Sequence, residues 1–436
     1  MHERPVELLQ RLIRFDTSNP PGNERACIEW ARDLLEENGC SVRIVARDPE
    51  RPSLVARLSG DGRAPGLLLQ GHVDVVPAKG TWSRPPFGGE VVDGYVWGRG
   101  ALDMKGGVAM MLSAFLQAAG ADAPPPGDVV LCLLSDEEGR GDFGARFMVE
   151  NHPELFDGVR FAIGEFGGFT MDVAGRRVYP IMVAEKQLCS LRATLRGPAG
   201  HGSLPVRDGA MGKLGRLLSA LERRRLPVHV TPVARSLIEG IAAEAPRATR
   251  LPVRALLRPR LTDRVLDRLG ERGRLFDVLL HNTASATVIR GGHAHNVIPG
   301  EVSVDLDCRL LPGFRPDDVF QELGALAGVP LELEVVRYDP GPPAPDLTLF
   351  DTLGAILREL DPEARPVPLL LPGVTDGRFF ARLGIQTYGF LPMQLPSKMR
   401  FLELVHGVDE RIPVDAVAFG TTAIRRLLER FGNARP

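Results

Sequence analysis

The first part of the chain alternates between helical spacing of apolar residues and short, continuous apolar runs. Helical spacing covers residues 5–15 and resumes at Asn23, which can cap a helix ending before Gly39. A further helix is expected from Asp103 to about Gly120. Strand-like segments separate these helices at residues 41–45, 53–58, 66–70, 128–134 and 159–163. This alternation predicts an α/β fold with a mostly parallel sheet that is covered on both faces.

Acidic and histidine residues follow two of the buried strand runs. His72 comes directly after the run at 66–70, and Glu137 and Glu138 come after the run at 128–134. Open α/β sheets bind their ligands at the carboxyl ends of the strands. We therefore expect these three side chains to contribute to one site.

After about residue 185 the pattern changes to that of an α+β domain. Strand signals at 187–196, 284–290, 301–310 and 331–337 alternate with helix signals at 210–223 and 317–326. This β-α-β-β-α-β order predicts a ferredoxin-like domain, interrupted by an Arg-rich, helical insertion at 231–281. A Pro-rich linker at 339–345 precedes a last segment that ends in a helix at 414–430. The expected organisation is a catalytic domain at 1–185 and 343–436 that holds an inserted lid or dimerisation domain at 186–342.

Composition limits the class of protein. A chain of 436 residues is expected to form two domains. With 25% charged residues and a net charge of −2, it lacks the basic patch expected of a protein that binds nucleic acid or anionic membranes. The five cysteines are scattered and form no disulfide or zinc-ribbon pattern. Neither a secretory signal nor a run of about 18 apolar residues is present. We therefore expect a cytoplasmic protein.

Three sequence blocks between His72 and Glu138 contain the candidate metal ligands and a candidate group for proton transfer. The first has His72 and Asp74, the second has Asp103 in a Gly-rich turn, and the third has Glu137 and Glu138. Imidazole and carboxylate groups are the ligands of an oxygen- and nitrogen-coordinated metal site, and one carboxylate is left over for proton transfer. The blocks favour a metal-dependent hydrolase.

The chain resembles the dinuclear zinc amidohydrolase and peptidase family M20, which includes aminoacylases, acetylornithine and succinyl-diaminopimelate deacylases, and glutamate carboxypeptidase. The resemblance extends nearly end to end. It rests on Gly71-His72-Val73-Asp74, on Asp103-Met104-Lys105-Gly106-Gly107 and on Asp136-Glu137-Glu138-Gly139. It continues in Gly200-His201-Gly202-Ser203, Asn296-Val297-Ile298-Pro299-Gly300 and His406-Gly407. Blocks in this order are far more specific than any one of them alone.

The resemblance implies a role for each residue of the catalytic domain. His72 would bind one metal while Asp74 orients its ring. Asp103, at a helix start and followed by a cis peptide, would bridge two metals. Glu138 would bind the second metal, and Glu137 would be the general base on the bridging water.

The resemblance implies two more metal ligands, one for each ion. Glu165, after the apolar run at 159–163, would bind the His72 metal, and His406 would bind the Glu138 metal. Glu154 and Asp172 are the nearest rivals of Glu165, although neither follows a strand signal closely. Three other residues are interpreted as loop residues: Asp142, His293 and His295.

The inserted domain and its flanks would supply substrate contacts. The resemblance implies that His201 reaches the active site of a partner subunit and stabilises the oxyanion. Asn296 and Arg309 would hold the polar or carboxylate part of the substrate, and Arg378 would be a further carboxylate clamp. A surface ion pair is the competing interpretation of each arginine. This arrangement implies a homodimer formed through the inserted domain.

The expected function is hydrolysis of an amide bond in an N-acyl amino acid or short peptide that has a free carboxylate. Two divalent ions would be needed, and the ligands suit zinc, with cobalt or manganese possible. Deacylase and dipeptidase or carboxypeptidase activities both remain open. A metallo-phosphoesterase would need a phosphate-binding loop, which is not evident. A catalytically silent scaffold is disfavoured because Glu137 is present.

Overall fold

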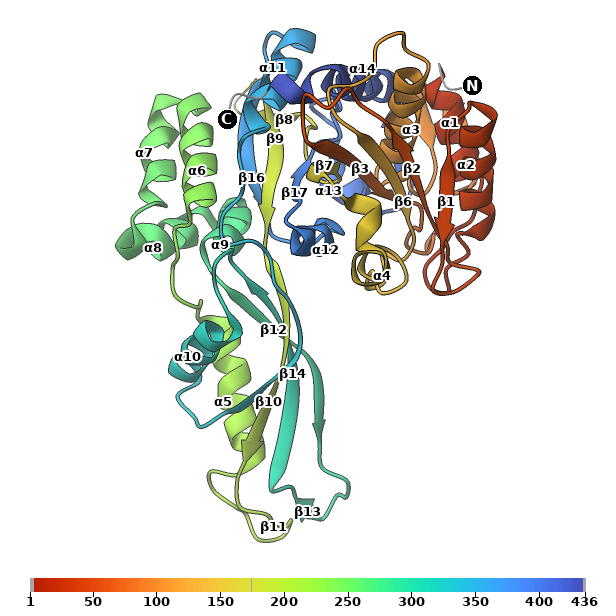
Figure 1. Cartoon of the computed structure of the whole chain (residues 1–436). Coiled ribbons are helices and arrows are strands. Elements are labelled where there is room, and N and C mark those ends of the chain that lie inside the picture. The colour runs from red at the N-terminus through yellow and green to blue at the C-terminus, as the bar shows by residue number, and fades with distance from the viewer. Residues whose placement is uncertain (1–3, 174, 434–436) are drawn as a thin grey trace. The chain divides into compact units, whose positions relative to one another are not determined.

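A computed structural model describes residues 4–173 and 175–433 (Figure 1). The chain forms two compact units. Unit 1 comprises residues 1–183, 345–369 and 375–436, and unit 2 comprises residues 184–344 and 370–374. Unit 1 is thus assembled from segments that lie on both sides of unit 2 in the sequence.

Unit 1 is built on a nine-stranded sheet with the order β1-β2-β6-β3-β7-β17-β9-β16, and β8 pairs with β9. The strands are β1 (Val42–Val45), β2 (Ser53–Leu58), β3 (Gly66–His72), β6 (Val129–Leu134), β7 (Val159–Gly164), β8 (Met171–Val173), β9 (Arg176–Glu185), β16 (Arg365–Leu371) and β17 (Gln386–Gly389). The short strands β4 (Glu90–Val92), β5 (Tyr95–Trp97) and β18 (Arg411–Pro413) form a separate sheet.

The parallel sheet expected from the sequence forms the centre of this unit. Strands β6, β3, β7 and β17 are parallel neighbours. On the two flanks, β1 and β2 on one side and β9 on the other run antiparallel to their neighbours. The sheet is therefore mixed, with parallel strands at its centre and antiparallel strands on both flanks.

Helices cover both faces of the central strands. On one face, α3 (Lys105–Ala119) contacts β3 and β6 and packs against α1 (Pro5–Ile13) and α14 (Val414–Arg430). On the other face, Leu68 and Val130 share an apolar cluster with α4 (Ala145–Asn151) and α12 (Gly377–Phe380). The remaining helices of the unit are α2 (Arg25–Glu37), α11 (Phe350–Leu360) and α13 (Phe401–Leu404). Helix α2 begins after Glu24, which makes no side-chain cap, so the predicted Asn23 cap is wrong.

Unit 2 contains an antiparallel sheet in the order β12-β14-β10-β15. Its elements follow the ferredoxin-like sequence β10 (Gln187–Arg196), α5 (Ala210–Arg223), β12 (Thr283–Gly291), β14 (Glu301–Leu310), α10 (Pro316–Ala327) and β15 (Glu332–Asp339). The Arg-rich insertion is helical, as predicted: α6 (Pro232–Glu244), α7 (Arg247–Ala255), α8 (Pro259–Leu269) and α9 (Arg274–Leu280). A two-stranded ribbon pairs β11 (Gly200–His201) with β13 (Val297–Ile298). In the described ranges, no helix has the length and apolar character needed to cross a membrane.

Candidate metal centre

Three neighbouring parallel strands end beside one another and present the candidate ligands. His72 is the last residue of β3, and Glu165 follows the last residue of β7. Strand β6, which pairs with β3 on its other side, leads into the turn that carries Glu137 and Glu138. Asp136 at the start of that turn has φ of +69°, a left-handed conformation that aspartate tolerates better than most residues. The carboxyl edge of the sheet thus gathers these side chains.

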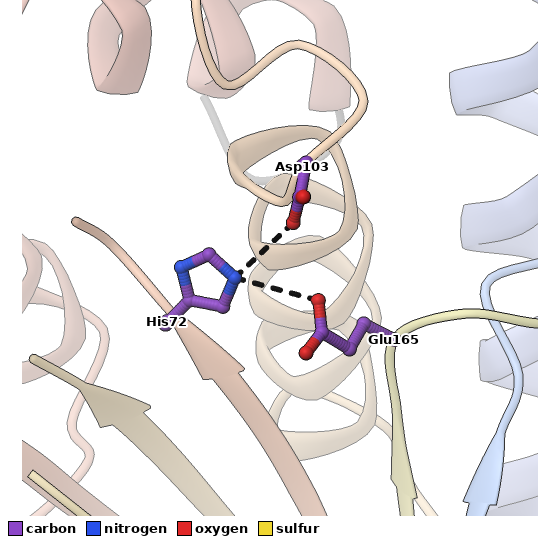
Figure 2. A group of neighbouring side chains, drawn as sticks. All are labelled: His72, Asp103 and Glu165. Carbon is purple, nitrogen blue, oxygen red and sulfur yellow. Dashed lines mark hydrogen bonds and ion pairs between the residues drawn. The ribbon is translucent and has the colours of Figure 1, made fainter. Parts of the chain in front are cut away.

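The first ligand group consists of His72, Asp103 and Glu165, all of them buried. Figure 2 shows the three side chains converging, with Asp103 entering from the turn before α3. The Nε2 atom of His72 lies 3.2 Å from Oδ1 of Asp103 and 3.4 Å from Oε2 of Glu165. Their ligand atoms all lie within 4.8 Å of one another, so one cation can contact all three.

The second ligand group shares Asp103 with the first and adds Glu138 and His406. Nε2 of His406 lies 3.1 Å from Oδ2 of Asp103 and 3.0 Å from Oε1 of Glu138. The two oxygens of Asp103 therefore face one histidine each. Helix α3 begins at Lys105, two residues after Asp103, and the two histidines are side-chain partners of the Asp103 carboxylate.

The charges of the cluster suit divalent cations. Burial raises the pKa of Glu165 to about 8 and also raises the pKa of Glu138. Burial opposes ionisation of Asp103 as well, but hydrogen bonds with His406 and His72 outweigh it and hold the pKa of Asp103 below its usual value. Buried carboxylates stay ionised only beside positive charge. Three carboxylates and two imidazoles, without a thiolate, form a donor set that fits two divalent ions.

Glu137 lies next to these groups but belongs to neither of them. Burial raises its pKa well above the usual value, and the neighbouring Glu165 carboxylate adds to the shift. Its Oε1 atom is 4.0 Å from Nη1 of Arg378. A carboxylate with a raised pKa that is not a ligand can accept a proton and return it.

Asp74 contacts both the His72 ring and the turn that follows β6. The Nδ1 atom of His72 lies 2.9 Å from the main-chain oxygen of Asp74 and 3.5 Å from its carboxylate. Because a carbonyl oxygen only accepts, Nδ1 donates and Nε2 is left to face the ligand group. The Asp74 carboxylate also accepts hydrogen bonds from the backbone N–H groups of Glu137 and Glu138, each at 3.1 Å. It therefore holds the turn that carries the proposed base and a proposed ligand.

A buried network behind Asp74 was not predicted. The Asn19 amide donates to Asp74 at 2.9 Å and to Asp136 at 3.1 Å. Asp136 is also paired with Arg51 at 3.0 Å, and Arg51 pairs with the fully buried Glu24 at 2.7 Å. The only local signal in the sequence is the turn-forming Asn19-Pro20-Pro21, which does not indicate these partners.

A second unpredicted pair, Arg99 and Glu410, supports the second ligand group. Both side chains are buried and form an ion pair. Glu410 also accepts hydrogen bonds from the backbone N–H groups of Leu102, at 2.8 Å, and Asp103, at 3.2 Å. Arg99 donates to the main-chain oxygen of His406 at 3.2 Å. The pair thus connects the Asp103 turn to the His406 segment.

Replacing Glu410 with glutamine is expected to weaken binding of the ion at the second group by about 10–100-fold, as is typical when a residue that positions a ligand is changed. Calorimetric metal titration measures this effect, with the melting temperature recorded in parallel. The matched control is Glu90→Gln, which removes a partly exposed ion pair with Arg84. Unchanged affinity for both ions in Glu410→Gln would limit the pair to a role in stability.

Arg378 is buried beside the proposed base. Its guanidinium donates to the main-chain oxygens of Thr375, at 2.6 Å, and Arg140, at 3.2 Å. Asp376 is also buried, and neither of its carboxylate oxygens has a hydrogen-bond partner in the described part of the chain. Burial raises the pKa of Asp376 to about 7. The segment at 375–378 thus adds a cation and a second acid near Glu137.

In unit 2, His201 and Asn296 lie together on the β11–β13 ribbon, where His201 pairs with Val297, the residue after Asn296. Both side chains are exposed. The backbone N–H of Ser203 points to Nδ1 of His201 at 3.3 Å. Since a backbone N–H can only donate, Nδ1 accepts and Nε2 carries the proton, so the ring can donate outward.

Arg309 is occupied by a local partner. Its guanidinium makes two bonds to Asp307 on the same strand, at 2.8 and 3.1 Å. An ion pair is the competing interpretation of Arg309, against a role in substrate binding. His293 and His295 are exposed residues in the loop before β13.

The model of peptidase family M20/M25/M40 matches residues 68–430. The human N-fatty-acyl-amino acid synthase/hydrolase PM20D1 is 29% identical over 381 residues, which cover 84% of this chain and 74% of that protein. Succinyl-diaminopimelate desuccinylase of Paracoccus denitrificans is 29% identical over 98% of both chains. Among solved structures, an M20 metallo-carboxypeptidase from Sulfolobus solfataricus has a TM-score of 0.69 at 19% identity, covering 98% of this chain and 99% of its own. Human carnosine dipeptidase 1 has a TM-score of 0.62 at 16% identity, covering 99% and 97%.

Proposed function

This chain belongs to peptidase family M20/M25/M40 and is a metal-dependent hydrolase of amide bonds, and we propose that its substrate is an N-acyl amino acid with a free carboxylate. The observation that carries the proposal is the pair of ligand groups that share Asp103, with Glu137 beside them. Two relatives that cover most of the chain, the human hydrolase and the Paracoccus desuccinylase, have names that describe hydrolysis of N-acyl amino acids. They favour a deacylase over a dipeptidase or carboxypeptidase.

We assign one ion to His72, Asp103 and Glu165 and the other to Asp103, Glu138 and His406. Zinc is the first choice because imidazole and carboxylate ligands suit it, while cobalt and manganese accept the same set. Divalent ions bound here would polarise the amide carbonyl and lower the pKa of a coordinated water to about 7.

Glu137 is the proposed general base and then the general acid. It removes a proton from the attacking water, whose oxygen forms the new bond to the carbonyl carbon. When the C–N bond breaks, Glu137 returns the proton to the leaving nitrogen. The products are the acid of the acyl group and the free amino acid. Asp74 contributes by holding the backbone of the Glu137–Glu138 turn.

We also propose which side chains contact the substrate. Arg378, beside Glu137, is assigned to the side of the site from which the amine leaves, where the carboxylate of the amino acid would lie. Asn296 and Arg309 are assigned to the polar part of the substrate, although Arg309 would have to exchange its bonds to Asp307. His201, with its outward N–H, is assigned to the oxyanion of the tetrahedral intermediate in a partner subunit.

Replacing His201 with alanine is expected to lower kcat by about 10²–10³-fold, since that is the usual cost of losing one oxyanion donor. The melting temperature should not change, because the side chain is exposed. Steady-state kinetics provide the measurement, with His293→Ala, an exposed loop histidine of the same unit, as the control. Equal rates for both variants would eliminate the oxyanion role.

The proposed function is tested by screening for release of free amine from N-acyl amino acids and dipeptides, before and after loading the protein with zinc or cobalt. Turnover of N-acyl amino acids only after loading supports it. A loaded protein that releases amine from neither class refutes it. We also propose a homodimer formed through unit 2 and a cytoplasmic location; the latter is supported by the five free cysteines.

A further inference from the structure

A hollow lined by arginines lies in the helical insertion of unit 2. Helix α6 packs against α7, and α7 contacts α8 (Figure 1). The hollow opens among these helices and has a volume of about 410 Å³. Small-molecule sites in proteins commonly have volumes of about 300–1,000 Å³, so a small organic molecule can enter it. Three arginines, one glutamate and one leucine line it: Arg235, Glu239, Arg254, Leu257 and Arg258.

The insertion concentrates positive charge. Residues 231–281 contain ten arginines and no lysine, against six acidic residues, whereas the whole chain has a net charge of −2. Several of these acids neutralise groups that do not line the hollow: Asp267 and Asp277 pair with Arg225, and Asp263 pairs with His281. The excess of positive charge in the insertion is therefore not cancelled by these carboxylates at the hollow.

Two of the three lining arginines have no protein partner. Arg254 and Arg258 are exposed, and within residues 4–173 and 175–433 neither guanidinium has a hydrogen-bond acceptor or an ion-pair partner. Glu239 is the only acid among the described residues that line the hollow. Its Oε1 atom lies 3.8 Å from Nη1 of Arg235, so this carboxylate balances Arg235. Two positive charges therefore remain for an anion.

The arginines are attached to a packed scaffold. Leu256, between Arg254 and Arg258 in the sequence, is fully buried. It belongs to the same apolar cluster as Ala234, which precedes Arg235. The backbone positions of all three arginines are thus held by the core of the insertion, which lowers the entropy that a ligand must remove on binding.

The turn after α7 keeps the two arginines without partners close in position. The backbone N–H of Leu257 donates to the main-chain oxygen of Arg254, and that of Arg258 donates to Ala255, each at 3.1 Å. The helical path therefore continues past the end of α7, and Arg258 follows Arg254 by about one turn. Like charges at this spacing repel one another, and an anion bound between them removes the repulsion.

A phosphate monoester matches this charge and this lining. It carries a charge of about −1.5 to −2 at pH 7, which balances Arg254 and Arg258 together, whereas one carboxylate balances only one of them. Guanidinium groups also bind phosphate oxygens through pairs of parallel hydrogen bonds. Leu257 offers an apolar contact to an organic group attached to the phosphate.

We propose that the hollow among α6, α7 and α8 binds a small soluble organic phosphate, with the phosphate on Arg254 and Arg258 and the organic part against Leu257. The hollow includes none of the residues assigned to metal binding or catalysis. The proposal therefore stands independently of the proposed function.

The test is calorimetric titration of the full-length, zinc-loaded protein with AMP, adenosine and inorganic phosphate. AMP should bind. Adenosine should bind at least about 100-fold more weakly, because it lacks the charged acceptors for the two arginines. Inorganic phosphate should bind more weakly than AMP, because it has no organic part to contact Leu257.

Three variants locate the bound AMP. Arg254→Gln and Arg258→Gln should each weaken AMP binding by about 10–100-fold, the usual effect of losing hydrogen bonds to a charged group. Arg264→Gln makes the same change at an exposed arginine of α8 that does not line the hollow, and it should bind AMP normally. All three side chains are exposed, so the melting temperatures should agree with that of the unmodified protein. The metal centre is the same in all three, so AMP held by the ions would bind them equally.

Several outcomes would overturn the proposal. They are absence of AMP binding, equal affinity for AMP and adenosine, and AMP binding that persists in Arg254→Gln and Arg258→Gln. Equal affinity for AMP and inorganic phosphate would also overturn it, because the organic part would then make no contact. A last arm uses vesicles of phosphatidylcholine and phosphatidic acid. Binding to these vesicles without binding of AMP would assign the arginines to a lipid headgroup in place of a soluble ligand.

Discussion

Replacing Glu137 with glutamine is expected to lower kcat by about 10²–10⁴-fold, the usual contribution of a general base, while the protein still binds two ions. Glutamine keeps the shape of the side chain but cannot accept the proton. The two ligand groups do not include Glu137, so metal binding should persist. Steady-state kinetics and metal analysis of the purified variant provide the measurement.

The control for this variant is Glu154→Gln, the same chemical change at an exposed glutamate that pairs only with Arg43 and His152 in the contacts that we describe. It should retain full activity. Loss of an ion from Glu137→Gln would show that Glu137 is a ligand. Full activity of that variant would place the base elsewhere, and Asp376, buried nearby with a raised pKa, would become the next candidate.

Replacing Asp103 with alanine is expected to remove both ions and with them the catalysed reaction. Asp103 faces His72 with one oxygen and His406 with the other, so its loss leaves each group with two ligands. The affinity for each ion should fall by more than about 100-fold, which exceeds the effect typical of a residue that only positions a ligand. Metal analysis after dialysis, together with turnover, measures the effect.

A comparison with His406→Ala makes this prediction specific. His406 belongs only to the second group, so that variant should lose one ion and keep the other. Its side chain is about half exposed, at 49%, which limits the cost to folding. If Asp103→Ala also retained one ion, Asp103 would not be shared between the two sites.

The candidate site residues that directly follow an apolar run could be predicted from the sequence. His72, Glu138 and Glu165 each follow a continuous apolar run, and those runs became the adjacent strands β3, β6 and β7. The periodicity of unit 2 was equally informative, because amphipathic strands and helices alternate on either side of the helical insertion at 231–281. Such patterns depend on which face of an element is buried, and that information is local.

The residues that hold the site in place could not be predicted in this way. Arg99 and Glu410 are far apart in the sequence, and neither lies in a pattern that identifies its partner. The backbone path after β3 places both the carbonyl and the carboxylate of Asp74 toward His72, and local sequence patterns do not indicate that path. The small pocket beside Asp103 and Glu165 is lined by four segments that only the folded chain brings together. The mixed flanks of the sheet were also missed, since an apolar run does not indicate the direction of its neighbour.

The sharing of Asp103 between the two candidate ligand groups also bears on when each group is complete in a newly made chain. The first ligand group lies wholly within residues 72–165, whereas the second needs His406, near the other end of the chain. During translation, every side chain of the first group has been synthesised before unit 2 begins at residue 184. The second group is completed only after all of unit 2 has left the ribosome. A truncated chain that ends before residue 406 therefore has a complete set of candidate ligands for only one of the two proposed ions.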